Sequence, residues 1–67
     1  MNVYVNGERR ELPDTATLAD LLAAGRPGSA RGVAVAVDGQ VVPRAEHAAT
    51  GLHEGARVEI VTAVQGG

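Results

Sequence analysis

The stretch that decides the fold is residues 57–67, which read RVEIVTAVQGG. Apolar side chains at Val58 and Ile60 alternate with neighbours on the opposite side, and a period of two is the spacing of a β-strand that buries one face. The alternation predicts a strand over about residues 57–64. Two bare glycines follow, so the end of the chain offers no bulky side chain for packing.

Composition limits the classes of protein to which the chain can belong. Its 67 residues carry a net charge of −2 and include no cysteine, which excludes disulfides, thiolate metal sites and thiol nucleophiles. A chain of this length forms one small domain. Dispersed arginines and a single tyrosine argue against nucleic-acid binding, and the lack of a long apolar run argues against a membrane span. We expect a cytoplasmic protein that is monomeric on its own.

Turn and cap signals upstream of the last strand define the other elements. Asn-Gly at 6–7 and Asp-Gly at 38–39 are strong signals for tight hairpins, and Thr17 followed by Asp20 matches a helix N-cap. The predicted elements are strands at about 2–6 and 8–12, a helix from about 18 to 24, strands at 33–37 and 40–42, and a short helical turn at 44–50 with its alanines packed inward.

This order of elements predicts an α+β fold of the ubiquitin-like β-grasp type. One main helix packs across a mixed sheet of about five strands, and the last strand lies beside the first. The expected domain is residues 1–64, followed by a flexible Gly-Gly tail at 65–67.

The side chains do not form a convincing catalytic or metal site. His47 and His53 are the only imidazoles, whereas zinc needs three or four converging ligands. We therefore expect both histidines to be structural and expect no bound metal. Ser29 has no companion base nearby in the sequence, so a hydrolytic triad is not expected either. Catalysis by the side chains of the chain itself is therefore not expected.

The remaining reactive group is the C-terminal carboxylate of Gly67. It is ionised at neutral pH and can attack the α-phosphate of ATP to form an acyl-adenylate. Gln65 and Gly66 precede it, and residues 64–67 fully extended reach roughly 13 Å. Such a tail can thread a narrow channel in another protein because glycine has no Cβ.

A docking face is predicted from the register of the last strand. If Val58 and Ile60 point into the core, Val61 and Ala63 lie on the open side of the sheet. Tyr4 is out of phase with its apolar neighbours and should share that side. We interpret Tyr4, Val61 and Ala63 as part of a surface that docks a partner enzyme, although scattered exposed apolar residues are also common in proteins without such a role.

Two stretches of the chain are distinctive: VAVDGQVVPR at residues 35–44 and LHEGARVEIVTAVQGG at residues 52–67. In these stretches the chain resembles the ThiS family, the sulfur carriers of thiamine biosynthesis. The opening Val-Asn-Gly hairpin and TLADLL at residues 17–22 also look like the family, so the similarity extends over essentially the whole chain.

The resemblance implies a carrier mechanism centred on Gly67. An E1-like adenylyltransferase, ThiF, would use MgATP to adenylate the carboxylate. A cysteine desulfurase or another donor would supply sulfur to make a thiocarboxylate, and thiazole synthase, ThiG, would take that sulfur. In this view the chain is a protein co-substrate and not an enzyme, and it would hold no cofactor itself. Two alternatives remain open: a sulfur carrier for another pathway, such as the molybdopterin-synthase small subunit, and a ubiquitin-like modifier or interaction module without sulfur chemistry.

Overall fold

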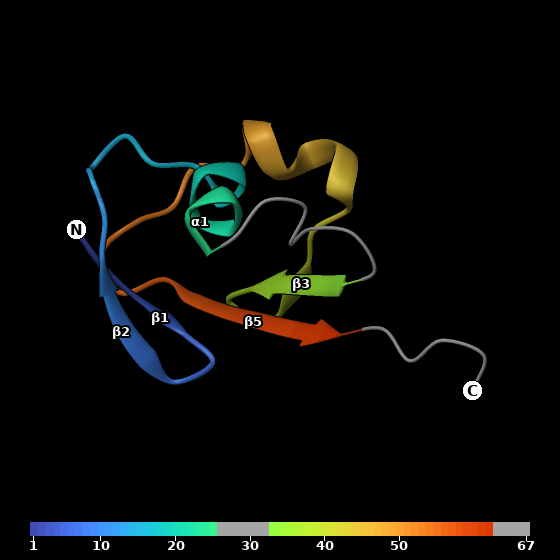
Figure 1. The fold of residues 1–67 in the computed structure, drawn as a ribbon, viewed down its shortest axis with the longest axis horizontal. Helices are drawn as coiled ribbons and strands as arrows, with labels where there is room; N and C mark the ends of the chain where they lie inside the picture. The colour runs from blue at the N-terminus through green and yellow to red at the C-terminus, as the bar shows by residue number, and fades with distance from the viewer. Residues whose placement is uncertain (26–32, 63–67) are drawn as a thin grey trace.

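A five-stranded mixed sheet with one helix laid across it forms the fold of the computed structural model, which describes residues 1–25 and 33–62. Its elements are β1 (Asn2–Val5), β2 (Glu8–Glu11), α1 (Leu18–Gly25), β3 (Val33–Val37), β4 (Gln40–Val41), the 3-10 helix η1 (Arg44–Ala49) and β5 (Arg57–Thr62). The strand order is β2-β1-β5-β3-β4. Helices α1 and η1 cover one face, and the other face is open (Figure 1). The predicted β-grasp fold is confirmed.

Strand β5 occupies the centre of the sheet. It pairs parallel with β1 through Tyr4↔Arg57 and Val5↔Val58, and it pairs antiparallel with β3 from Val37↔Val58 to Val33↔Thr62. The first strand therefore lies beside the last, as the sequence predicts. The predicted strand residues 63 and 64 lie outside the described residues.

Both predicted hairpin turns have the expected left-handed backbone. Asn6 and Gly7 have φ angles of 51° and 87°, and Asp38 and Gly39 have φ angles of 52° and 84°. Two successive positive φ angles define a type I′ turn, whose twist matches that of the flanking strands. Asparagine, aspartate and glycine tolerate this conformation best, which explains the choice of residues in both turns.

Helix α1 begins with the predicted reciprocal cap. The backbone N–H of Asp20 donates to Thr17 Oγ1 at 3.2 Å, and the backbone N–H of Thr17 donates to Asp20 Oδ2 at 2.9 Å. The pair satisfies N–H groups at the helix start that have no partner within the helix. In the described part of the chain, no helix is both long and apolar enough to cross a bilayer.

The core lies between α1 and the covered face of the sheet. Leu18 of α1, Val3 of β1 and Val58 of β5 are its largest fully buried side chains. Leu21, Leu22, Val35 and Leu52 complete most of the cluster. Because Val58 faces this core, the register of β5 is fixed, and a shift by one residue would bury its charged neighbours instead.

The short helix η1 packs differently from the prediction. We expected the alanines of residues 44–50 to face inward, but Ala45, Ala48 and Ala49 are exposed and His47 is buried. The imidazole fills more space than a methyl group, and its polar edge is satisfied because His47 Nε2 lies 3.0 Å from the carbonyl oxygen of Val42. A buried polar ring is tolerated when it has such a partner.

Candidate functional site

The predicted reactive tail lies beyond the described residues. Gln65, Gly66 and Gly67 are outside them, and so is the predicted docking residue Ala63. The described part ends at Thr62, the last residue of β5. The described elements that bear on this site are β5 and the strands and turns that hold it.

Tyr4 and Val61, the two predicted docking residues that the structure describes, are both exposed. Tyr4 has 41% of its surface exposed and Val61 has 62%. In contrast, Val3, Val5 and Val58 on the same two strands are buried. Tyr4 and Val61 therefore lie on the open face of the sheet, where period-two alternation places them.

Tyr4 and Val61 are not neighbours on that face. Tyr4 pairs with Arg57, and Val61 lies four residues further along β5, a separation of about 13 Å. Glu59 is exposed between them. Val61 instead has Ala34 of β3 opposite it, and Ala34 is also exposed. The sequence could not identify Ala34 as a neighbour because the pairing of β3 with β5 is a long-range contact.

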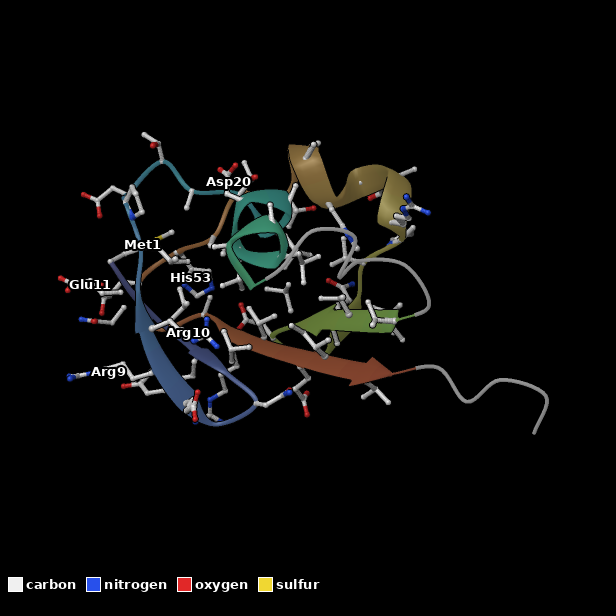
Figure 2. All side chains as sticks on the ribbon, viewed as in Figure 1. Met1, Arg9, Arg10, Glu11, Asp20 and His53 are labelled. Carbon is white, nitrogen blue, oxygen red and sulfur yellow. The ribbon has the colours of Figure 1, made fainter. Side chains whose placement is uncertain are left out.

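Tyr4 lies between two arginines on neighbouring strands, an arrangement that the sequence alone did not reveal. Arg9 of β2 pairs with Tyr4, which pairs with Arg57 of β5. On β2, Arg9 and Arg10 project to opposite sides of the strand (Figure 2). Among the described residues, neither Arg9 nor Arg57 forms an ion pair. The open face thus presents a tyrosine between two cations at one end and small apolar side chains at the other.

A second polar cluster joins the Asp38 turn to the start of β5. Asp38 Oδ1 accepts the backbone N–H of Arg57 at 3.0 Å, and Asp38 Oδ2 lies 2.6 Å from His53 Nε2. The other ring nitrogen of His53, Nδ1, lies 2.9 Å from the carbonyl oxygen of Glu54. Both ring nitrogens therefore face acceptors, an arrangement that the protonated imidazolium satisfies completely.

The pKa values of the two side chains follow from this geometry. The Arg57 backbone N–H, together with His53, lowers the pKa of Asp38. The hydrogen bond from His53 to Asp38, with a smaller effect of the Glu54 carbonyl, raises the pKa of His53. Neither ring nitrogen is free to act as a base, so the cluster holds a turn in place and does not form a catalytic dyad.

The histidines do not come together as metal ligands. His47 of η1 is buried, with its Nε2 at the carbonyl oxygen of Val42, whereas His53 is exposed and paired with Asp38. Within residues 1–25 and 33–62, no three His, Asp or Glu side chains are grouped so that they could hold a metal ion. The described residues thus offer an open sheet face with exposed Tyr4 and Val61, and the strand β5 that precedes the tail in the sequence, as the features that could serve a function.

Comparisons with known proteins agree on one family. The sequence profile of the ThiS family matches residues 3–67. A crystal structure of the thiamine biosynthesis protein (ThiS) from Geobacter metallireducens is similar with a TM-score of 0.85 and 30% identity, over 100% of both chains. An NMR solution structure of a thiamine biosynthesis protein from the same organism has a TM-score of 0.76 and 30% identity, over 100% of this chain and 88% of that one. The search of curated proteins gives no match.

Proposed function

Because the chain belongs to the ThiS family, whose profile matches through the two terminal glycines, we propose that it is the sulfur carrier for the thiazole moiety of thiamine. That match to residues 3–67 is the observation that carries the proposal. The similar structures from Geobacter metallireducens, described as thiamine biosynthesis proteins, support the same pathway.

The reaction proceeds at the Gly67 carboxylate in two steps. A carboxylate oxygen attacks the α-phosphorus of MgATP on an E1-like adenylyltransferase of the ThiF type, and pyrophosphate leaves. In the second step a sulfur nucleophile attacks the acyl carbon, and AMP leaves. Hydrosulfide gives the thiocarboxylate directly, whereas the persulfide of a cysteine desulfurase gives an acyl disulfide, whose S–S bond a thiol reductant must then cleave to release the thiocarboxylate. Adenylation is needed because a free carboxylate is a poor acceptor and AMP is a good leaving group. The resulting thiocarboxylate supplies sulfur to a thiazole synthase of the ThiG type.

The open face of the sheet is the surface that docks these partners. Tyr4 and Val61 are exposed on it, and exposed tyrosine is enriched in the residues that dominate binding energy at interfaces. Val61 lies one residue before the end of β5, so a partner that contacts it also lies close to the start of the tail. Ala63 is predicted to belong to the same face and lies outside the described residues.

Deletion of Gly66 and Gly67 tests the division between domain and tail. Residues 65–67 carry no apolar side chain, so the deletion should leave the melting temperature nearly unchanged. Carrier-dependent exchange of pyrophosphate into ATP by the adenylyltransferase should disappear. A large loss of thermal stability would show that the tail is structural, and persistent exchange would show that adenylation does not require the Gly-Gly end.

A further inference from the structure

Strand β5 pairs over different lengths with the strands on its two sides. On the β3 side, pairing extends from Val58 to Thr62. On the β1 side, it covers only Arg57 and Val58, because β1 ends at Val5 and the chain turns away. Beyond Val58, the edge of β5 that faces β1 has no strand beside it in the described part of the chain.

The side chain of Asn6 fills this gap. The backbone N–H of Asn6 donates to the Val58 carbonyl at 2.9 Å, the last main-chain contact between the two segments. The side chain then continues the pattern one step further. Its Oδ1 accepts the Ile60 N–H at 2.8 Å, and its Nδ2 donates to the Ile60 carbonyl at 3.3 Å. A carboxamide carries the same donor and acceptor as a peptide group, so Asn6 replaces the strand residue that β1 lacks.

We propose that Asn6 is a positioning residue for the chemistry at the tail, an inference that rests on the proposed carrier function. It fixes β5 at Ile60, two residues before Thr62 and seven before Gly67. With β3 on one side and Asn6 on the other, the last part of β5 keeps one direction relative to the docking face. The tail then starts from a defined point, and a terminal carboxylate presented in a narrow range of geometries reacts faster than one that must search for its partner.

The turn alone does not account for asparagine at this position. Asn6 has a φ of 51°, and glycine adopts that conformation without strain. A variant Asn6→Gly therefore keeps the type I′ turn and removes only the two side-chain bonds to Ile60.

The second hairpin provides a matched control. Asp38 occupies the same turn position with a φ of 52°, and its Oδ1 also accepts a backbone N–H of β5, that of Arg57 at 3.0 Å. Arg57, however, is the first residue of β5, at the end remote from the tail. Asp38→Gly removes a side-chain contact to the backbone of β5 at the end of the strand that is remote from the tail, and it therefore serves as the control.

The experiment compares both full-length variants with the wild-type chain in pyrophosphate exchange by the adenylyltransferase, with carrier concentration varied. Asn6→Gly should lower kcat about fivefold or more while KM for the carrier changes little, because docking is retained and presentation of the tail is loosened. Asp38→Gly should leave kcat unchanged although it also loses its side-chain contact to β5. Amide hydrogen exchange should accelerate at Ile60 in the first variant and at Arg57 in the second.

Several results would overturn the inference. If Asn6→Gly keeps the wild-type kcat although amide hydrogen exchange at Ile60 is faster, the side-chain contacts of Asn6 with Ile60 do not position the tail. An equal fall of kcat in Asp38→Gly would show a general loss of stability. If Asn6→Gly fails to fold, Asn6→Asp serves as the second variant because it keeps the Oδ1 acceptor and loses only the Nδ2 donor. Its kcat should fall by less than the fivefold expected for Asn6→Gly. A wild-type kcat in Asn6→Asp would contradict the role of Nδ2. A wild-type chain that supports no exchange would instead refute the proposed function, and this inference with it.

Discussion

At the scale of single residues, the polar contacts of this chain converge on the backbone of β5. Asn6 and Asp38 each begin a tight turn and each accept a backbone N–H from that strand, one at Ile60 and one at Arg57. Both turns could be predicted from the sequence, because few residue types tolerate a positive φ and Asn-Gly and Asp-Gly are among them. Their bonds to β5 could not, since Asn6 and Ile60 are 54 residues apart and only the folded sheet brings them together.

The contact between His53 and Asp38 predicts a pH-dependent stability. The pKa of His53 is raised from 6.5, so its contribution is fully present below pH 6.5 and is lost as pH rises through the higher folded value. The pKa of Asp38 is lowered from 3.8, so its contribution is present above pH 3.8 and is lost as pH falls through the lower folded value.

The comparison of wild type with His53→Gln measures this contribution. Thermal melts should show the largest difference in melting temperature between pH 3.8 and 6.5, where His53 is charged and Asp38 is ionised. The difference should shrink above that range. A difference that is constant from pH 4 to 9 would show that protonation of His53 has no part in holding the turn.

At the scale of elements, helix α1 depends on its cap because it is only eight residues long. Short helices are marginal without tertiary contacts and satisfied ends. Thr17→Ala removes the oxygen that accepts the Asp20 N–H and should lower the free energy of unfolding by about 1 kcal/mol. Thr17→Ser keeps the oxygen and should lose much less in the same denaturant titration. Equal losses in the two variants would assign the effect to the methyl group and not to the cap.

Strand β5 should carry the docking function through Val61. Val61→Asp places a charge on the open face and should weaken binding to the adenylyltransferase or to the thiazole synthase more than tenfold, about 1.4 kcal/mol, with the fold retained. Ala45→Asp is a suitable control because Ala45 is exposed on η1, which covers the opposite face (Figure 1). Unchanged affinity of Val61→Asp for both partners in calorimetric titration would place the docking surface elsewhere.

The bounds of the strands and helices could be predicted from the sequence better than the contacts between them. Strands, turns and the capped helix follow from local patterns, so their bounds within the described residues differ by only a residue from those observed, while the predicted end of the last strand lies outside them. The burial of His47 in place of the alanines of η1 depended on a contact with Val42, which periodicity does not reveal. The separation of Tyr4 from Val61 depended on the parallel register of β1 with β5, which could not be read from either strand alone.

At the scale of the whole molecule, the fold places β5 at the centre of the sheet and directs it toward the tail. The small core of Val3, Leu18 and Val58 fixes the register of that strand, and the open face lies on its other side (Figure 1). Under the proposed carrier function, the domain presents its last residues to partner enzymes. Because the same fold occurs in proteins with other functions, the proposal assigns the function to residues 65–67 and to the open face of the sheet, and not to the fold itself.

The most direct test of the carrier function is the intact mass of the chain after incubation with its adenylyltransferase, MgATP and a sulfur donor. The mass should rise by the difference between one sulfur and one oxygen atom, and fragmentation should place the change at Gly67. Sulfur on any other residue, or an unchanged mass with active partner enzymes, would contradict the sulfur-carrier function.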